Sequence, residues 1–493
     1  MFREFDYNRP IVEIVNEILT DANKLGASDI HFDPTPDGLN IRVRIDGELR
    51  QYTKVPEAVK RNLLTRVKII SGMNITETRL PQDGAIKGSI DTYSVDMRVS
   101  SLPIVDGEKI VIRLLDYSKS LEGLESLQFS APNLQKIIKA INSPNGIILV
   151  TGATGSGKST TVYSILQRLN DVKTNIITVE DPVEMKIAGI NQVQVMSEIG
   201  LTFGEALRSI LRQDPDTIMI GEIRDDETAR IAVRASITGH LVLSTIHTNN
   251  ALTTIERLLD MEVERYLLGS ALNTIIAQRL AKKLCPKCRK QVTPSEYERV
   301  ILEKVLNKKV DHIYKACGCE DCFDGYKGRI AVHEVLSIDQ EIRDAIVGNV
   351  KKQELRELVY KDNKTITMLQ DGLEKVVNGD TSFEELLTII DINDDIDEND
   401  EELKKAILGT TTQNTSQNKV NTPTTKTTGN NMAKPPAPAA AKPTTTTTNQ
   451  TAKPPAPKQT EAVGTNITTP TPPKPATPTP VTTNKNEESI ETL

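Results

Sequence analysis

The sequence lacks the long apolar runs and the cysteine density of membrane-spanning or disulfide-stabilised proteins. No stretch of its 493 residues approaches the roughly 20 consecutive apolar residues that a transmembrane helix needs. Residues 1–8 contain no basic region followed by an apolar one, so they do not resemble a secretory signal. Five cysteines are too few for a disulfide framework in a chain of this length. We therefore expect a soluble cytoplasmic protein.

The chain also lacks a positive net charge. Its formal net charge is -7, and eight lysines against four glutamates after Gly409 place the acidic excess in the part before that residue. A protein that binds nucleic acid mainly through phosphate contacts needs a basic face. We therefore do not expect nucleic acid as the main partner. The 38% hydrophobic content is enough to build cores for two or three domains.

The first part of the chain predicts a small α+β domain over residues 1–117. Apolar residues recur at helical spacing in 11–25, which indicates an amphipathic helix. Apolar and polar residues alternate in 41–45, 95–99 and 110–114, as they do in half-buried strands. One helix and several strands of this kind form a small domain with a single core.

After a linker over 118–130, the pattern predicts a doubly covered α/β core over 131–390. Four short runs are apolar throughout, as buried parallel strands are: 147–150, 176–179, 217–220 and 241–246. The segments between these runs have the pattern of helices, and so does 265–281. Short helices resume after a cysteine-bearing insert at 285–322.

The end of the chain predicts an acidic boundary and then a disordered tail, together covering 391–493. It opens with the acidic run 391–402, and from about Gly409 it consists almost only of Thr, Pro, Asn, Ala and Lys. Such a composition cannot bury enough apolar surface to offset the entropy of ordering. We expect this segment to act as a tether or a weak interaction segment.

Residues 152–160 (GATGSGKST) match the phosphate-binding loop known as Walker A, placed between an apolar run and an expected helix. Its glycines let backbone N–H groups point at phosphates, and the helix N-terminus favours negative charge. We expect Lys158 to reach the β and γ phosphates of ATP and the Ser159 hydroxyl to ligate Mg²⁺. The expected nucleotide-binding set is Gly152, Ala153, Thr154, Gly155, Ser156, Gly157, Lys158, Ser159 and Thr160.

Glutamates at the ends of two core runs are candidate catalytic residues. Glu222 follows the run TIMI, at the carboxyl edge where ligands bind in open α/β sheets, and we expect it to polarise the attacking water. Gly221 precedes it where many ATPases of this loop class have Asp, which weakens a direct contact with Mg²⁺. The segment ITVEDPVE supplies Glu180, Asp181 and Glu184, and we expect one of these carboxylates to help position water or Mg²⁺. The alternatives are an acidic turn that only caps the next element and, for Glu222, a surface residue at the end of a strand.

Two of the five histidines bracket one expected strand, LVLSTI. His247 lies at its carboxyl end near Thr245 and Thr248, and is the better candidate for sensing the phosphate state of the nucleotide. His240 lies at the other end. It is either a second sensor or a structural histidine.

Two C-x-x-C pairs predict a structural zinc site. Cys285 and Cys288 form one pair, and Cys319 and Cys322 form the other. Four thiolates suit a closed tetrahedral Zn²⁺ site, which stabilises structure and hydrolyses nothing. Cys317 is close enough in sequence to replace Cys319 as a ligand. A redox role for the thiols is the remaining alternative.

These motifs occur together in one known family. From residue 10 to about 390 the chain resembles the type II secretion and type IV pilus assembly ATPases (PilB/GspE-type). The resemblance rests on the order and number of matching stretches rather than on any single one. They are ASDIHFDP, VRIDGELR, RLPQDGAI, DMRVSSLP, GATGSGKST, ITVEDPVE, LRQDPDTIMIGEIRD, TGHLVLSTIHTN, the two C-x-x-C pairs and GYKGRIAVHEVL.

The resemblance implies a RecA-like ATPase domain joined flexibly to a PAS-like N-terminal domain, with ATP bound in the cleft between them. It also implies a homo-hexamer at the cytoplasmic face of the inner membrane, held by a platform protein and acting indirectly on pilin-like subunits. In this family, arginines of the N-terminal domain complete the ATP-binding site. The matching positions are Arg98 and Arg113, with Arg79 a weaker match. Periodicity alone would make Arg98 and Arg113 outward-facing strand residues.

The main functional prediction is a motor that hydrolyses ATP to assemble a type IV pilus or a type II secretion pseudopilus. One alternative is the related pilus-retraction ATPase, which typically lacks the four-cysteine insert. Another is a scaffold ring that binds nucleotide without turnover. Family members often carry a further N-terminal docking domain, whereas the resemblance here starts at residue 10. The partners decide whether the filament is a pilus, a pseudopilus or a DNA-uptake filament.

Overall fold

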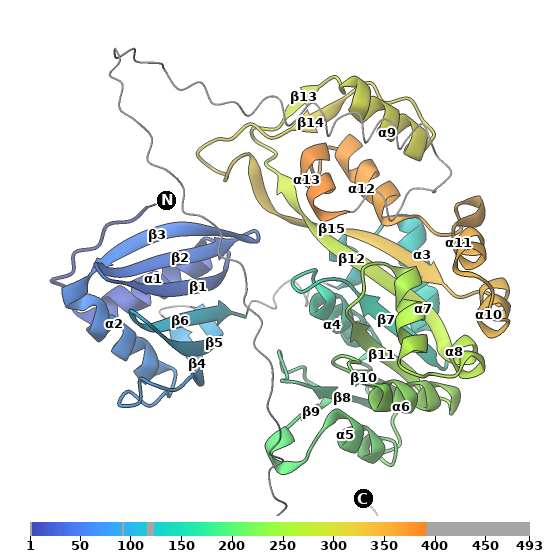
Figure 1. Cartoon of the computed structure of the whole chain (residues 1–493), viewed down its shortest axis with the longest axis horizontal. Coiled ribbons are helices and arrows are strands. Elements are labelled where there is room, and N and C mark those ends of the chain that lie inside the picture. The colour runs from blue at the N-terminus through green and yellow to red at the C-terminus, as the bar shows by residue number, and fades with distance from the viewer. Residues whose placement is uncertain (1, 91–92, 116–122, 391–493) are drawn as a thin grey trace, which may run out of the picture. The chain divides into compact units, whose positions relative to one another are not determined.

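The computed structural model describes residues 2–90, 93–115 and 123–390 (Figure 1). These residues form two large β-sheets, of six and seven strands, and one two-stranded sheet. With their helices they give the mixed α/β architecture that the sequence predicts. The predicted tail, 391–493, lies outside the described residues. Within the described part, no helix combines the length and the apolar character that crossing a membrane requires.

The N-terminal sheet is antiparallel throughout, with strand order β3-β2-β1-β6-β5-β4. Helices α1 and α2 pack on one face, where alternate strand residues such as Ile30, Phe32 and Val43 are buried together with Ile14 of α1. The predicted opening helix and the predicted alternating strands are therefore confirmed. The elements are α1 (Ile11–Lys24), β1 (Ala27–Thr35), β2 (Gly38–Ile45), β3 (Glu48–Pro56), α2 (Glu57–Ile70), β4 (Gln82–Ile90), β5 (Tyr93–Ile104) and β6 (Gly107–Leu114).

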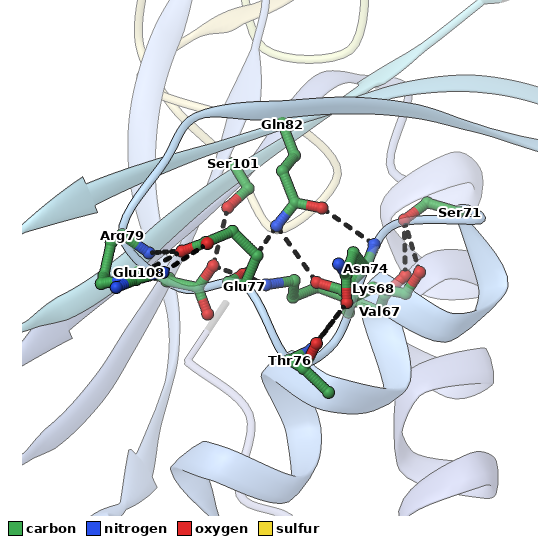
Figure 2. A network of polar contacts seen from close by, with 10 residues as sticks. All are labelled: Val67, Lys68, Ser71, Asn74, Thr76, Glu77, Arg79, Gln82, Ser101 and Glu108. Carbon is green, nitrogen blue, oxygen red and sulfur yellow. Dashed lines mark hydrogen bonds and ion pairs between the residues drawn. The ribbon is translucent and has the colours of Figure 1, made fainter.

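A polar network fixes the loop between α2 and β4, as Figure 2 shows. The ammonium of Lys68, whose side chain is only 2% exposed, donates to the Glu108 carboxylate at 2.6 Å and to the backbone carbonyl of Glu77 at 2.7 Å. The Gln82 amide donates to the same carbonyl at 2.8 Å. Arg79 pairs with the Glu77 carboxylate at 2.9 Å and remains 85% exposed. Lys68 and Gln82 thus hold the loop at the Glu77 carbonyl, and Arg79 is left exposed to solvent.

Replacing Lys68 with methionine should destabilise the N-terminal domain by about 3 kcal/mol, because it leaves the buried Glu108 carboxylate without its ionic partner. Hydrogen exchange of β5 and β6 would measure the change. Arg79→Met, in the same loop, is the matched control and should leave exchange nearly unchanged because that side chain is exposed. Equal protection in Lys68→Met and the wild type would contradict the role given to the buried pair.

The second sheet has strand order β15-β12-β7-β11-β10-β8-β9, parallel except for β15, which runs antiparallel to β12. All four predicted apolar runs are strands here. Alternate residues of β7 enter different cores: Ile147 and Leu149 pack with residues of α5 to α8, and Ile148 and Val150 with residues of α3 and α4. The strands are β7 (Gly146–Thr151), β8 (Ile176–Glu180), β9 (Asn191–Gln194), β10 (Thr217–Ile220), β11 (Leu241–Ile246), β12 (Leu272–Leu284) and β15 (Tyr326–Ser337).

Helices cover both faces of this sheet, as Figure 1 shows, and so confirm the predicted doubly covered α/β core. Beyond β12 the chain enters the insert, which holds α9 and the small sheet of β13 and β14, and it returns through β15. The remaining elements are α3 (Ala131–Ile141), α4 (Lys158–Leu169), α5 (Phe203–Ile210), α6 (Asp226–Ile237), α7 (Ala251–Asp260), α8 (Arg265–Ala271), β13 (Lys290–Val292), α9 (Glu296–Leu306), β14 (Ile313–Lys315), α10 (Gln340–Val347), α11 (Lys352–Tyr360), α12 (Met368–Val377) and α13 (Phe383–Ile389).

The prediction of a helix over 265–281 is wrong for most of its length. Helix α8 ends at Ala271, and the chain continues directly into β12. This segment contains the β-branched residues Thr274, Ile275 and Ile276, which favour a strand. It gains backbone hydrogen bonds from two neighbours, β7 on one side and β15 on the other. The partner strand β15 lies far along the chain, so this pairing could not be seen in the local pattern.

Candidate active site

The phosphate-binding loop, residues 152–159, begins directly after β7 and runs into the first turn of α4, as its pattern predicts. Gly152, Gly155 and Gly157 have positive φ angles of 149°, 79° and 90°, which side chains rarely adopt. The Lys158 ammonium folds back over the loop and donates to the carbonyls of Gly152 at 2.9 Å and Ala153 at 3.2 Å. Burial lowers the pKa of Lys158, and the nearby carboxylates of Glu222 and Glu184 oppose that shift. The ammonium is thus held where an anion would bind.

Gln278 of β12 supports the phosphate-binding loop, although it belongs to none of the sequence motifs. Its amide nitrogen donates to the Ser156 carbonyl at 2.7 Å, and its amide oxygen accepts from the Thr161 hydroxyl of α4 at 2.8 Å. A Cβ atom at position 152 would lie 2.4 Å from the backbone carbonyl oxygen of Gln278 and 2.5 Å from the hydroxyl oxygen of Ser156. The loop is therefore packed closely against β12. The available signal was a glutamine that directly follows the apolar run 275–277.

The loop fits a nucleotide phosphate. Its glycines leave the backbone uncovered, and its conformation is held from β7, α4 and β12. The Ser156 hydroxyl is buried without a hydrogen-bond partner among the described residues. Ser159 follows Lys158 in the first turn of α4, and both residues line the cavity described below. Together these groups provide donors and a hydroxyl ligand, as binding of a nucleotide with Mg²⁺ requires.

Glu222 lies just beyond the carboxyl end of β10, next to His247, which lies just beyond β11. The Nε2 atom of His247 is 3.5 Å from the Glu222 carboxylate, and the Arg224 guanidinium is 2.5 Å from it. The Glu222 side chain is 16% exposed, whereas those of its two partners are 50% and 65% exposed. The ion pair with Glu222 raises the pKa of Arg224. The structure therefore brings the two predicted residues together at the edge of the sheet.

His240 lies at the opposite end of β11 from His247. Its Nδ1 atom is 2.8 Å from the carbonyl of Ala235 and 3.3 Å from the hydroxyl of Thr238. A strand of this length separates its two ends by roughly 20 Å. The structure does not bring His240 to the loop, and its contacts are those of the structural alternative. We leave it out of the proposed catalytic set.

Glu180 and Glu184 occupy different environments although they are close in sequence. Glu180, the last residue of β8, is 3% exposed and accepts hydrogen bonds from Tyr163 at 2.5 Å, Thr178 at 2.6 Å and Gln192 at 3.0 Å. Glu184 lines the cavity above the loop and favours the charged form of Lys158. Of these two glutamates, the half-buried Glu184 is therefore the more accessible to water or Mg²⁺.

The arginines of the N-terminal sheet lie on its polar face. Arg98 and Arg113 are directly opposite each other on neighbouring strands, as outward-facing residues. The guanidinium of Arg113 donates to the Asp29 carboxylate at 3.0 Å, and that of Arg98 donates to the carbonyl of Val183 at 3.2 Å. Arg44, which the sequence analysis did not identify, lies 3.6 Å from Asp29. Asp29 thus holds two arginines of neighbouring strands on one face.

One cavity of about 800 Å³ contains most of the predicted site. Its wall includes the phosphate-binding loop, the acidic and histidine residues at the edge of the second sheet, and residues of the polar face of the first sheet. Arg98, Arg79 and His240 are not among its lining residues, whereas Arg113 is. The charged and histidine residues of the lining are Asp29, Arg44, Arg113, Lys158, Glu180, Asp181, Glu184, Glu222, His247 and Arg329, and its hydroxyl residues include Ser159 and Tyr163.

The four predicted zinc ligands come together at the base of the insert. Their sulfur atoms all lie within 4.8 Å of one another. The Cys285–Cys319 and Cys288–Cys322 sulfur pairs are 3.9 and 3.7 Å apart. A tetrahedral zinc with bonds of about 2.3 Å needs sulfur separations of about 3.8 Å, so the cluster fits the ion. Cys317 is exposed and outside the cluster, which favours Cys319 as the ligand.

Comparisons with known proteins agree with this geometry. Putative type II secretion system protein E of Escherichia coli (strain K12) is 46% identical over 385 residues, or 78% of each chain. Type IV pilus assembly ATPase PilB of Myxococcus xanthus is 45% identical over 382 residues, covering 77% of this chain and 67% of that protein. Among solved structures, the pilus retraction motor PilT with bound ADP matches with a TM-score of 0.53 and 27% identity, over 79% of this chain and 98% of that one.

The Legionella pneumophila ATPase DotB shares the fold, with a TM-score of 0.58 and 23% identity over 79% of this chain and 98% of that one. Residues 4–388 match the type II/IV secretion system protein family as a whole. This span includes the phosphate-binding loop, the glutamates and the four-cysteine insert. On the strength of the match over these residues and of the relatives above, the chain belongs to the type II/IV secretion system protein family.

Proposed function

We propose that this protein is the motor subunit that powers assembly of a type IV pilus or a type II secretion pseudopilus. The chain is an ATP-hydrolysing enzyme of its family. The observation that carries the proposal is the convergence of Lys158, Glu184, Glu222 and His247 on one cavity. The four-cysteine cluster favours assembly or secretion over retraction, since retraction motors typically lack that insert.

The phosphate-binding loop, Glu222 and His247 each have a chemical role in transferring the terminal phosphoryl group to water. The backbone N–H groups of the loop and the Lys158 ammonium bind the β and γ phosphates. Mg²⁺, when held by the Ser159 hydroxyl, supplies positive charge to the phosphate oxygens. Glu222 accepts a hydrogen bond from the attacking water and orients it toward the phosphorus. His247, beside Glu222, is placed to respond to loss of the γ phosphate.

The arginines supply positive charge from the N-terminal domain. Arg113 lines the cavity, and its link to Asp29 fixes its direction. A positive charge held next to the transferred phosphoryl group stabilises the negative charge of the transition state in a site that excludes water. Arg98 acts differently, because it holds the backbone of Val183, next to Glu184. Hydrolysis then depends on the N-terminal domain being closed over the nucleotide.

We place this motor in a homo-hexamer at the cytoplasmic face of the inner membrane. A platform protein in that membrane would receive the motion of the ring and pass it to pilin-like subunits. The family resemblance supports this arrangement, as do relatives named for type II secretion and for pilus assembly. Nucleic acid is not an expected partner, since the chain carries a net charge of -7.

Gene replacement tests the proposed function. Deleting the gene from the source bacterium should abolish its surface filaments or its type II secretion, because no ATP-driven assembly remains. Wild-type protein should restore them, and Glu222→Gln protein at the same cellular level should not. Filaments that persist or become more numerous after the deletion would show retraction instead. Restoration by the Glu222→Gln protein would favour a scaffold without turnover.

A further inference from the structure

One buried hydroxyl joins three elements beneath the active site. Tyr163 lies on α4, the helix that follows the phosphate-binding loop, and is 1% exposed. Its hydroxyl donates to the Glu180 carboxylate at 2.5 Å and accepts from the backbone N–H of Glu184 at 3.2 Å. Burial, together with the charge of Glu180, raises the pKa of Tyr163 far above its ordinary value. The phenol therefore stays protonated and can donate at any physiological pH.

The other oxygen of Glu180 extends the same network toward β9. It accepts from Gln192 at 3.0 Å, and the Gln192 amide also donates to the carbonyl of Met185 at 2.9 Å. The oxygen of that amide accepts from the N–H of Ile187 at 2.8 Å. The segment from 184 to 187 is thus held at three points: at Glu184 by Tyr163, and at Met185 and Ile187 by Gln192.

The burial of Glu180 argues against a direct part in the reaction. It is 3% exposed and accepts three hydrogen bonds from protein groups. A carboxylate with two oxygens so occupied has little capacity left for water or a metal ion. Both glutamates line the cavity, but Glu184 is only half-buried and lies close enough to Lys158 to influence its pKa. The network therefore acts on the reaction through Glu184.

We propose that Tyr163, Glu180 and Gln192 are positioning residues that set Glu184 against the terminal phosphate of bound ATP. The proposal rests on the proposed function, since it requires ATP hydrolysis at this loop. Tyr163 lies on α4, the helix that begins at Lys158. The hydrogen-bond clamp formed by Tyr163, Glu180 and Gln192 therefore fixes Glu184 relative to the phosphate-binding loop. A displacement of about 1 Å at such a position can cost on the order of 100-fold in rate.

Tyr163→Phe tests the proposal, because it removes one oxygen atom and keeps the ring. We expect kcat for ATP hydrolysis to fall by about 10-fold or more, because Glu184 loses its anchor. The KM for ATP should change less than about twofold, since Lys158 and the loop remain in place. Tyr52→Phe is the matched control: its buried hydroxyl donates to the Asp21 carboxylate at 2.9 Å in the N-terminal domain. It should leave kcat unchanged.

A double-mutant cycle with Glu184→Ala separates positioning from a structural role. If Tyr163 acts through Glu184, adding Tyr163→Phe to Glu184→Ala should lower kcat no further. Gln192→Met loosens the clamp from the edge strand β9 and should reproduce the loss of kcat, which covers the case in which Tyr163→Phe folds poorly. Additive losses in the cycle, or full kcat in both Tyr163→Phe and Gln192→Met, would overturn the proposal. ATP hydrolysis that still depends on Glu222 would then leave the proposed function standing.

Discussion

Replacing Glu222 with glutamine should lower kcat for ATP hydrolysis by about 1000-fold while leaving ATP affinity within about threefold of the wild type. The carboxylate lies beyond the end of β10, 3.5 Å from His247 and close to Lys158. Glutamine keeps the shape of the side chain but is a much weaker acceptor for a proton of the attacking water. The phosphate contacts of the loop do not involve Glu222, so binding should persist.

Steady-state hydrolysis and titration with a fluorescent ATP analogue would measure the two effects separately. Glu227→Gln is the matched control, because Glu227 pairs with Arg208 on the surface and lies outside the cavity. It should hydrolyse ATP at the wild-type rate. A Glu222→Gln protein with a kcat within threefold of the wild type would show that another group orients the water.

We expect the four-cysteine cluster to bind zinc, and removing the metal should free the two C-x-x-C turns, residues 285–288 and 319–322. Structural zinc sites contribute apparent binding free energies of about 10–16 kcal/mol, most of it available to folding. Without metal, the exposed Lys287–Asp321 ion pair still joins these turns, but Cys319 is exposed and Cys288 and Cys322 are only half-buried. Cys285→Ser, or chelation of the metal, should therefore lower the thermal midpoint by about 10 °C or more. Protease cleavage near 317–325 should become faster.

Elemental analysis, proteolysis and thermal melting of freshly purified protein would test the zinc prediction. Cys317→Ser provides the control, because this exposed thiol lies outside the cluster. Its metal content and melting temperature should equal those of the wild type. Protein that contains no zinc, together with an unchanged melting temperature for Cys285→Ser, would contradict the site.

Local patterns were sufficient for the central part of the fold and for the phosphate-binding loop. The apolar runs that became β7, β8, β10 and β11 are short and buried on both faces, which is what parallel strands require. The loop motif carries its own context, a strand before it and a helix after it. The C-x-x-C pairs likewise predicted a cluster whose geometry fits zinc.

The remaining features depend on contacts between distant segments. The local pattern predicts a helix over 265–281, where most of β12 forms, because the pairing of β12 with β15 spans the whole insert. For the same reason the local pattern gives no role to Gln278 of β12, which supports the phosphate-binding loop. Glu180 and Glu184 looked equivalent in sequence. They differ because Tyr163 and Gln192, from two other elements, bury the first of them.

The central claim is that ATP binds with its phosphates at Lys158 and is hydrolysed there. The most direct test compares nucleotide binding and hydrolysis by wild type and Lys158→Ala under identical conditions. We expect Lys158→Ala to fold normally, to bind the fluorescent ATP analogue at least about 100-fold more weakly, and to hydrolyse no measurable ATP. Hydrolysis by Lys158→Ala at a rate near that of the wild type would show that the reaction takes place elsewhere.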